Sequence, residues 1–436
     1  MFEKVPAPGA EKTENDQPEK AILVSVVLDD RDLMDTDSSL DELEELLKTA
    51  GGVSMGRVIQ SREKPEKATY IGSGKLEEVA SLCKMLFCDL VVFDCELAPS
   101  QIRNLEARLE DVRVIDRTML ILDIFAQNAK TQEGMLQVLI ANLKYTLTRL
   151  SGSGDSLSRQ GGGIGTRGPG ETKLEADRRH LKRKIRKLES ELQELSKKRQ
   201  IQRRGREKSG VFQIAMAGYT NAGKSSLLNL LCEESILAQD KLFATLDPTT
   251  RRLKLPHFGE ALLTDTVGFI NRLPHHLVEA FKSTLDEVAY SDLVLLVVDA
   301  TDPKFQQKTE ITERILEEIC RERNVPLPET LYVLNKTDLP ESLFSVRAFP
   351  KDKPFVCVSA KTGAGKEELL DRIEEILERA KKNCAFLFPH EEGGRLSFLY
   401  QNASVTSVRY EEEGVYVQAL CDEKTRGALA KFLKNS

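Results

Sequence analysis

The stretch VFQIAMAGYTNAGKSSLLNLL, residues 211–231, decides the fold of the middle of the chain. Its apolar start suits a buried parallel strand, and its apolar end suits a helix. Between them, Gly218 to Ser225 match the phosphate-loop pattern GxxxxGK followed by Ser or Thr, in the strand-loop-helix context that the pattern requires. The glycines let backbone N–H groups turn toward phosphates, while Lys224 reaches the outer phosphates and the Ser225 hydroxyl binds Mg²⁺. We therefore predict a P-loop domain with a mostly parallel sheet.

Three further motifs follow at predicted strand ends, in the order that a GTP-binding domain requires. DTVG supplies Asp265, which holds Mg²⁺ through water, and Gly268, whose N–H meets the γ-phosphate. NKTD supplies Asp338, whose carboxylate accepts two hydrogen bonds from guanine that adenine has no donors to make, so it selects GTP over ATP. SAK, residues 359–361, brings backbone amides to guanine O6. The predicted GTP-binding domain covers residues 210–384.

A switch loop is expected between the phosphate loop and DTVG, in KLFATLDPTTRR, residues 241–252. Such a loop needs a threonine whose hydroxyl completes the Mg²⁺ shell and whose N–H contacts the γ-phosphate, so that GTP orders the segment and hydrolysis releases it. Thr245, Thr249 and Thr250 are the candidates. Position alone does not choose among them.

Two residues depart from the commonest small-GTPase pattern. Phe269 follows DTVG, where many such enzymes carry a glutamine that orients the attacking water, and a phenyl ring forms no hydrogen bond to water. We therefore expect slow intrinsic hydrolysis that a partner accelerates. Asn221, inside the phosphate loop, suggests K⁺ beside the β- and γ-phosphates, where it would stabilise charge in the transition state. The alternative is an asparagine that satisfies local backbone groups.

Two helical stretches before the phosphate loop carry apolar residues at alternating steps of three and four. They are Leu136, Ile140, Leu143, Leu147 and Leu150, and then Leu181, Ile185, Leu188, Leu192 and Leu195. This narrow seam is typical of helices that pair lengthwise, so we predict an antiparallel helical hairpin over residues 131–208. The alternative is two unrelated amphipathic helices on globular cores. The tip, residues 151–172, is glycine-rich, and such backbone can approach a ligand or partner closely.

Charge is distributed unevenly along the chain. The net charge is −6, yet residues 173–208 hold 15 Lys and Arg against six Asp and Glu, a local charge of +9. This segregation is the electrostatic signature of an RNA or phosphate-rich partner, and the alternative is a solvated helix face that only aids solubility. The expected contacts to such a partner are Arg159, Arg167, Arg178, Arg179, Lys182 and Arg183.

The two ends of the chain predict further domains. Residues 1–20 are polar and charged and predict a disordered tail. Residues 21–130 alternate β-branched runs with helical segments, which predicts a parallel α/β domain, and the capping-box pattern of Ser39 with Glu42 predicts a helix that begins at Ser39. Residues 385–436 predict a small α+β domain, for which a ribosomal-protein contact and a stabilising cap are equally good interpretations.

Composition excludes several classes of protein. Apolar residues at 40% and charged residues at 30% exclude a membrane-embedded or wholly disordered chain. The longest apolar run, residues 293–298, is far shorter than the roughly 18 residues of a membrane-spanning helix. Eight cysteines form no CxxC pair and no Cys/His cluster, so we expect a cytoplasmic protein without a zinc site or disulfide framework. We also expect a monomer.

The segments GGGIGTRGPGETKLEADRR, GYTNAGKSSLLN, FATLDPTTR, DTVGFI and NKTD together resemble the HflX family of translational GTPases, over residues 21–382. The resemblance implies that FATLD contains the Mg²⁺-binding switch threonine, Thr245. Phe269 is similar to the apolar residue that the family usually carries at this position, so the absence of a glutamine is not peculiar to this chain. The resemblance also implies that the protein binds the large ribosomal subunit and splits stalled or idle 70S ribosomes under stress, with the glycine-rich loop directed toward the peptidyl transferase centre. Lys173 departs from the glutamine that often continues the first motif.

Motifs and resemblance together give the expected site. Lys224, Thr245 and Gly268 are the expected catalytic residues, and the cofactor Mg²⁺ is expected on Ser225, Thr245 and, through water, Asp265. The expected GTP-binding residues are Gly218, Tyr219, Thr220, Asn221, Ala222, Gly223, Lys224, Ser225, Phe243, Ala244, Thr245, Leu246, Asp247, Asp265, Thr266, Val267, Gly268, Asn335, Lys336, Thr337, Asp338, Ser359, Ala360 and Lys361.

Two other functions remain open at this point, and GTP is only an occupancy signal in both. One is an RNA-binding module for ribosome assembly, which would bind free large subunits without splitting ribosomes. The other is a switch that recognises a protein partner through the N-terminal domain, in which case replacing the basic residues of 178–187 would leave partner binding intact.

Overall fold

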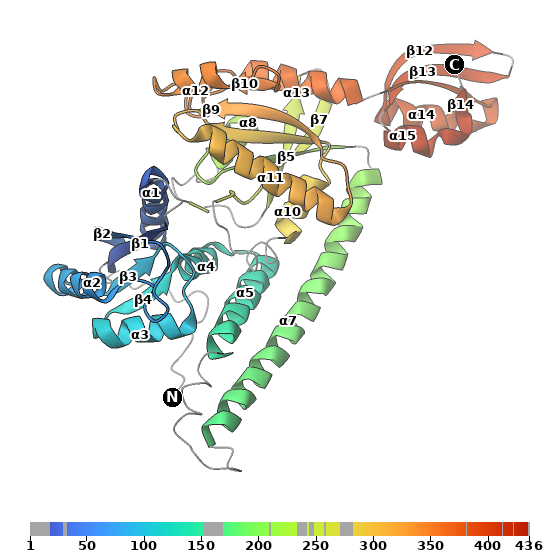
Figure 1. Cartoon of the computed structure of the whole chain (residues 1–436). Coiled ribbons are helices and arrows are strands. Elements are labelled where there is room, and N and C mark those ends of the chain that lie inside the picture. The colour runs from blue at the N-terminus through green and yellow to red at the C-terminus, as the bar shows by residue number, and fades with distance from the viewer. Residues whose placement is uncertain are drawn as a thin grey trace. The chain divides into compact units, whose positions relative to one another are not determined.

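Three β-sheets organise the described part of the chain (Figure 1). The computed structural model describes residues 18–28, 33–151, 169–208, 211–232, 242–243, 248–256, 259–270, 282–380, 382–411, 413–421 and 423–434. These form two compact units, one with residues 1–193, 239–247 and 272–282, the other with residues 194–238, 248–271 and 283–436. Most of the predicted tail and of the predicted tip loop lies outside the described residues.

The N-terminal sheet has four parallel strands in the order β2-β1-β3-β4. Every residue of the central strand β3 is buried, as expected when helices cover both faces of a parallel sheet. This architecture confirms the predicted α/β class. Its elements are β1 (Lys20–Leu28), α1 (Leu33–Ala50), β2 (Val53–Arg62), α2 (Ser73–Leu86), β3 (Leu90–Phe93), α3 (Pro99–Leu109), β4 (Arg113–Asp116) and α4 (Arg117–Asn128).

Helix α1 begins at Leu33, so the predicted start at Ser39 is wrong. Ser39 is buried within the helix, and Glu42 pairs with the buried guanidinium of Arg117 instead of capping a helix end. Arg117 also donates to Asp94 at 2.8 Å, which leaves the buried charges mutually paired. Ser39 and Glu42 therefore have the sequence spacing of a capping box, but Glu42 belongs to a buried ion-pair cluster and caps no helix.

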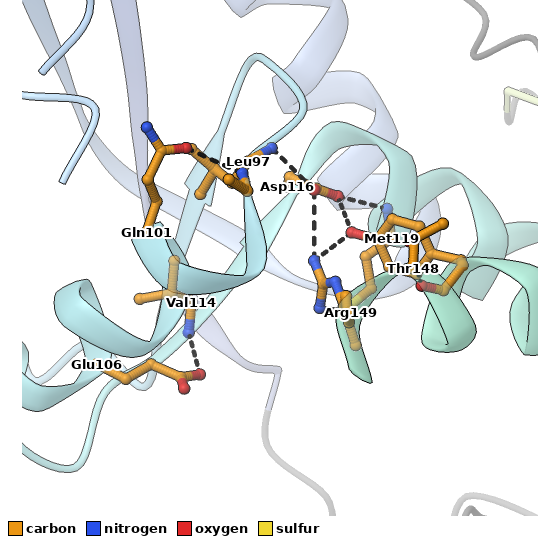
Figure 2. A network of polar contacts seen from close by, with 10 residues as sticks. Leu97, Gln101, Glu106, Val114, Asp116, Met119, Thr148 and Arg149 are labelled. Carbon is orange, nitrogen blue, oxygen red and sulfur yellow. Dashed lines mark hydrogen bonds and ion pairs between the residues drawn. The ribbon is translucent and has the colours of Figure 1, made fainter. Parts of the chain in front are cut away.

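The buried carboxylate of Asp116, at the carboxyl end of β4, joins three elements (Figure 2). It caps α4 by accepting from the Met119 N–H at 2.9 Å, and it accepts from the Leu97 N–H at 3.2 Å. From α5 (Gln132–Ser151), the Tyr145 hydroxyl donates to it at 2.6 Å and the Arg149 guanidinium at 3.3 Å. These bonds tie the first helix of the predicted hairpin to the N-terminal sheet.

The second helix of the predicted hairpin is α7 (Pro169–Lys208). It begins inside the stretch 151–172, which the sequence predicts as a loop, because proline suits the first helical turn, where no N–H partner is needed. Ile185 of its apolar seam is buried. Lys144 of α5 and Glu189 of α7 form an ion pair at 3.0 Å, which joins the two helices.

The second sheet has six strands in the order β10-β9-β8-β5-β7-β6, all parallel except β6. This confirms the predicted, mostly parallel P-loop sheet. The carboxyl ends of parallel strands share one edge, so residues that follow β5, β7, β8 and β9 gather there. The elements are β5 (Phe212–Gly218), α8 (Lys224–Cys232), β6 (Thr249–Leu255), β7 (Gly259–Asp265), α10 (Lys282–Ala289), β8 (Leu293–Asp299), α11 (Phe305–Arg323), β9 (Glu329–Asn335), α12 (Ser342–Ala348), β10 (Phe355–Cys357) and α13 (Lys366–Ala380).

The third sheet is antiparallel, in the order β12-β13-β11-β14, and it confirms the predicted C-terminal α+β domain. Phe386, Phe388 and Val417 form its buried core together with α14. The elements are β11 (Lys382–Phe388), α14 (Gly393–Asn402), β12 (Ser404–Glu411), β13 (Gly414–Cys421), α15 (Glu423–Ala428) and β14 (Leu433–Lys434), with 3-10 turns at His390–Glu392 and Ala430–Phe432. Among the described residues, no helix is long and apolar enough to cross a membrane.

Candidate nucleotide-binding site

The phosphate loop connects β5 to α8, and two of its positions accept only glycine. Gly218 has φ +154°, and a Cβ there would lie 2.3 Å from the carbonyl oxygen of Val297. Gly223 has φ +89°, and a Cβ there would lie 2.2 Å from Asn335 Nδ2. The loop is therefore pressed against β8 on one side and against the NKTD motif on the other, as a backbone phosphate cradle requires.

Lys224 lies buried within this loop. Its Nζ donates to the carbonyl oxygens of Gly218 at 3.1 Å and Tyr219 at 2.9 Å. Burial lowers the pKa of Lys224 to about 8, while the negative charge of Asp265 acts in the opposite direction. The ammonium group is thus bonded to neutral acceptors within the loop, and an incoming phosphate would outcompete them.

The predicted Mg²⁺ residues of the P-loop and DTVG motifs meet directly. The Ser225 hydroxyl donates to Asp265 Oδ2 at 2.7 Å, and Asp265 is almost fully buried at the end of β7. A hydroxyl and a carboxylate are both hard oxygen donors, and Mg²⁺ takes few protein ligands beside phosphate and water. The residues present therefore fit Mg²⁺. The neighbouring Thr266 has a structural role, because its hydroxyl donates to the Met216 carbonyl at 2.6 Å.

The DTVG motif is bonded to the phosphate loop through backbone groups. The Thr220 N–H donates to the Phe269 carbonyl at 2.8 Å, and the Phe269 N–H donates to the Gly218 carbonyl at 3.0 Å. A Cβ on Gly268 would lie 2.9 Å from Thr220 Cα and 3.0 Å from Lys224 Nζ, so this close contact also needs glycine. The Phe269 side chain is buried, so it is directed into the protein interior instead of toward water.

The guanine side of the site is joined by Asn335. Its Nδ2 donates to the Ala222 carbonyl at 2.9 Å, and its Oδ1 accepts from the Ala360 N–H at 3.0 Å, so it links the phosphate loop with SAK. Asp338 Oδ1 accepts from the Ser359 hydroxyl at 2.7 Å, and the Asp338 residue is exposed at the strand end. The structure therefore brings together the phosphate loop, DTVG, NKTD and SAK.

The switch segment is described only in part. Ala244, Thr245, Leu246 and Asp247 lie outside the described residues. Phe243 belongs to the N-terminal compact unit, where its ring packs against Phe125 with centroids 4.6 Å apart. Asn128 Nδ2 donates to the Phe243 carbonyl at 3.0 Å, and the Leu242 N–H donates to Thr49 Oγ1 at 3.2 Å. The N-terminal domain therefore holds the start of this segment.

The other two candidate threonines are part of strand β6. Thr250 shares a hydrogen bond of 3.0 Å with Thr264 of β7, and Thr249 pairs with Asp265 in the sheet register. Both are therefore engaged in the β6–β7 pairing. The prediction for Thr245 falls outside the described residues and stays a prediction.

The predicted RNA-contacting residues that the structure describes lie on α7. Arg178, Arg179, Lys182 and Arg183 are all exposed. Arg179 forms an ion pair with Glu175 at 3.7 Å, one turn earlier, and this pair is itself exposed. Arg159 and Arg167 lie outside the described residues.

Asp299 contacts the site although no motif points to it. Its Oδ2 accepts from Lys336 Nζ at 2.6 Å, so it holds the lysine of NKTD. A sequence signal exists in retrospect, because Asp299 ends the apolar strand LVLLVVD, and functional groups of parallel sheets follow the carboxyl ends of strands.

A phosphate loop bonded to DTVG, NKTD and SAK on a mostly parallel sheet defines a P-loop GTPase. Three family models match consecutive parts of the chain: GTP-binding GTPase N-terminal over residues 37–126, GTP-binding GTPase middle region over 128–206, and 50S ribosome-binding GTPase over 213–336.

Curated relatives cover nearly the whole chain. GTPase HflX of Lacrimispora saccharolytica is 46% identical over 412 residues, 94% of this chain and 96% of the relative. GTPase HflX of Escherichia coli K12 is 43% identical over 402 residues, 92% of each chain. A GTP-binding protein of Sulfolobus solfataricus, solved with GDP, is 25% identical, with a TM-score of 0.44 over 83% of this chain and 99% of its own. The chain belongs to the HflX family of GTPases, and it binds GTP and GDP and hydrolyses GTP.

Proposed function

We propose that this GTPase binds the large ribosomal subunit in its GTP state, splits stalled or idle 70S ribosomes in the cytoplasm under stress, and uses hydrolysis for release. The observation that carries the proposal is the exposed basic face of α7, with Arg178, Arg179, Lys182 and Arg183. The family model over residues 213–336 is described as a 50S ribosome-binding GTPase, which supports the same partner. On this proposal the protein acts as a monomer.

The electrostatics of α7 favour an RNA partner. Residues 173–208 carry +9 and the rest of the chain carries −15, so one element is attracted to a polyanion while its surroundings are repelled. Binding would release counterions from the RNA, which makes affinity salt-dependent. The helix is tied to α5 by Lys144–Glu189, and α5 is tied to the N-terminal sheet by Asp116. On this proposal the basic helix is the part of the protein that contacts ribosomal RNA, and its binding energy drives the subunits apart.

The catalytic roles follow from the geometry around the phosphate loop. Lys224 would leave its carbonyl partners for the β- and γ-phosphates, and the Gly268 N–H would donate to the γ-phosphate. Mg²⁺, held by Ser225, Thr245 and, through water, Asp265, supplies positive charge to the phosphate oxygens when bound. The backbone hydrogen bonds between Phe269 and the phosphate loop hold these groups next to one another.

Two features set the rate in this proposal. The buried Phe269 ring contributes no hydrogen bond to water, so ribosome binding must complete the site before hydrolysis is fast. Asn221 has φ +60° and an exposed side chain within the phosphate loop, an arrangement that would allow its amide oxygen to hold K⁺ beside the phosphates. Equal hydrolysis rates in K⁺ and Na⁺ at matched ionic strength would remove K⁺ from the proposal.

Guanine selection is assigned to Asp338. Its carboxylate is oriented by the Ser359 hydroxyl at 2.7 Å and is exposed at the strand end, where it can accept the two guanine donors. Asn335 would act indirectly, because both its amide atoms bond to the protein itself.

Sedimentation of intact 70S ribosomes through sucrose gradients tests the main proposal. With excess protein, a non-hydrolysable GTP analogue and physiological salt, we expect separate small and large subunits, and GDP should give far less separation. Intact 70S particles would contradict splitting. Co-sedimentation with free large subunits alone would favour the RNA-binding assembly module, and ribosome binding unaffected by charge reversal on α7 would favour the protein-partner switch.

A further inference from the structure

Asp299 lies at the carboxyl edge of the six-stranded sheet. Each of its two carboxylate oxygens binds a different neighbouring residue. Oδ1 accepts from the Thr301 N–H at 2.9 Å and from the Thr301 hydroxyl at 2.6 Å. Oδ2 accepts from Lys336 Nζ at 2.6 Å. Thr301 therefore fixes the plane of the carboxylate, and the remaining oxygen is aimed at the lysine of NKTD.

The sheet brings these two residues together. Strands β8 and β9 are parallel neighbours, and Asp299 stands opposite Asn335 in their register. The Ala300 N–H donates to the Asn335 carbonyl at 3.0 Å, which extends the pairing past both strand ends. Lys336, the next residue, has φ +64°, a left-handed conformation that turns its side chain out of the alternation of the strand. The position of Lys336 relative to Asp299 is thus set by backbone bonds.

A lysine on its own would be poorly ordered at this edge. Its long side chain has many rotamers, and the loss of their entropy opposes binding if the side chain is ordered only when the nucleotide binds. The ion pair with Asp299 is partly shielded, since 30% of the Lys336 side chain and 21% of the Asp299 side chain are exposed. With the ammonium group fixed, the four-carbon stem of Lys336 is also restricted, and such a stem can serve as an apolar surface.

We propose that Asp299 is a positioning residue for guanine nucleotides: it holds Lys336 so that the stem of this lysine forms one wall of the base pocket before the nucleotide arrives. The proposal rests on the nucleotide-binding role proposed for NKTD. Asp299 acts through Lys336 and touches neither phosphate nor base. Because the stem faces a ring surface, its contribution does not depend on the 2-amino group that Asp338 recognises.

A double-mutant cycle tests this role, with Asp299→Asn, Lys336→Met and the double variant. The Asp299→Asn side chain retains an oxygen for Thr301 and loses the charge, while the Lys336→Met side chain retains a stem and loses the ammonium group. The measured quantities are the Kd of a fluorescent GDP analogue, the Kd of IDP by competition, and kcat and KM for GTP. We expect Asp299→Asn to weaken GDP and IDP alike by about five- to tenfold, because the unpaired lysine would be ordered only on binding, with kcat changed less than about twofold.

The coupling between the two residues decides the outcome. In the Lys336→Met background, Asp299→Asn should have no further effect on Kd, because the residue that it positions is absent. An equal fold-loss in both backgrounds, or no loss in either, would overturn the proposal. If GDP weakened while IDP did not, the effect would belong to the recognition of the 2-amino group by Asp338, and the positioning role would also be rejected.

Asp286→Asn is the matched control for general loss of an ion pair. Asp286 and Arg323 also meet at 2.6 Å, and their side chains are 25% and 28% exposed, close to the values for Asp299 and Lys336. This pair joins α10 and α11. The control variant should retain wild-type Kd. Thermal unfolding of all variants without nucleotide identifies any that are misfolded, and for these Asp299→Glu, which retains the charge, provides the second test: partial recovery of Kd is expected, and none would count against the proposal.

Discussion

At the scale of single residues, Lys224 carries the clearest electrostatic conflict in the site. It is buried, its partners in the phosphate loop are neutral carbonyls, and burial lowers its pKa to about 8. The unfolded chain has the ordinary lysine value of 10.5. Between pH 8 and 10.5 the unfolded state therefore binds more protons, so the contribution of Lys224 to the unfolding free energy rises with pH over this window. Nucleotide phosphates have the opposite effect, because they favour the charged form.

Nucleotide affinity should consequently fall above pH 8. The free protein loses the Lys224 proton there while the complex keeps it, so the Kd for GDP should rise by about fivefold between pH 8 and 9. Fluorescence titration of a GDP analogue from pH 7 to 9 measures this. Lys224→Arg is the control, since its guanidinium stays charged and its Kd, although weaker, should be constant over the range. A constant Kd for the unaltered protein would show that Lys224 is not the titrating group.

Whether a residue of the nucleotide site could be predicted from the sequence depended on how far its partners lie from it along the chain. Gly218, Lys224 and Ser225 were predictable because the phosphate loop is a local motif whose spacing carries its chemistry. Asp299 was not, because its role appears only once β8 and β9 pair and bring it beside Lys336. Short sequence patterns reveal local motifs. An ion pair between residues at the ends of neighbouring strands can be recognised only when the pairing of the strands is known.

At the scale of elements, buried polar side chains decide how the N-terminal helices are attached. Asp116 accepts four hydrogen bonds, from the Leu97 and Met119 N–H groups and from the Tyr145 and Arg149 side chains. Such a network is costly if any partner is removed, because the buried carboxylate then keeps its desolvation cost.

Tyr145→Phe should lower the unfolding free energy by about 1–2 kcal/mol, and Asp116→Ala by about 3 kcal/mol or more. Urea unfolding followed by circular dichroism measures both. Nucleotide affinity should be unchanged in variants that stay folded, because Asp116 and Tyr145 contact no predicted nucleotide-binding residue in the bonds described. Equal stability of the Asp116 variant and the unaltered protein would mean that the network contributes nothing net.

Phe243 gives a second prediction for this unit. Its ring is buried against Phe125, so Phe243→Ala should destabilise the N-terminal unit by about 3–5 kcal/mol, the usual cost of removing a buried aromatic side chain. Differential scanning calorimetry measures the loss. Phe344→Ala is the control, because 69% of Phe344 is exposed and its removal should cost almost nothing. Equal effects of the two substitutions would contradict the packing role of Phe243.

Element boundaries were the least predictable level. The Ser39–Glu42 pattern has the spacing of a capping box, yet α1 starts at Leu33, because Glu42 is needed by the buried Arg117. Helix α7 starts at Pro169 for a local reason that the sequence does contain, since proline is favoured in a first turn. The fold class was predictable, because alternating strands and helices leave few topologies.

At the scale of the whole molecule, charge segregation is the main feature. Residues 173–208 carry +9 in a chain of net charge −6, and the exposed arginines of α7 present that charge to solvent. The average charge of the chain therefore says little about its partners, and the local field governs association with a polyanion.

Reversing two charges on α7 should weaken ribosome binding. For Lys182→Glu with Arg183→Glu, we expect the Kd for the large subunit to rise and the slope of log K against log salt to fall by roughly 1–2. Pelleting assays at KCl concentrations of roughly 50 to 300 mM measure both. Arg314→Glu with Arg321→Glu changes the net charge equally at exposed positions of α11 and should leave the slope unchanged. Identical slopes for the two variants would mean that the α7 charges are not the binding surface.

Leu242 and Phe243 lie in the GTPase part of the sequence but belong to the compact unit that contains the N-terminal sheet. Neither half of the gene can therefore be exchanged freely during evolution. A foreign N-terminal half would need an aromatic ring in place of Phe125 to pack against Phe243, and an amide in place of Asn128 to donate to the Phe243 carbonyl. A fragment that begins near residue 210 would likewise present the switch segment without the helix that holds its first residues. The turnover number of such a fragment would therefore not be that of the whole protein.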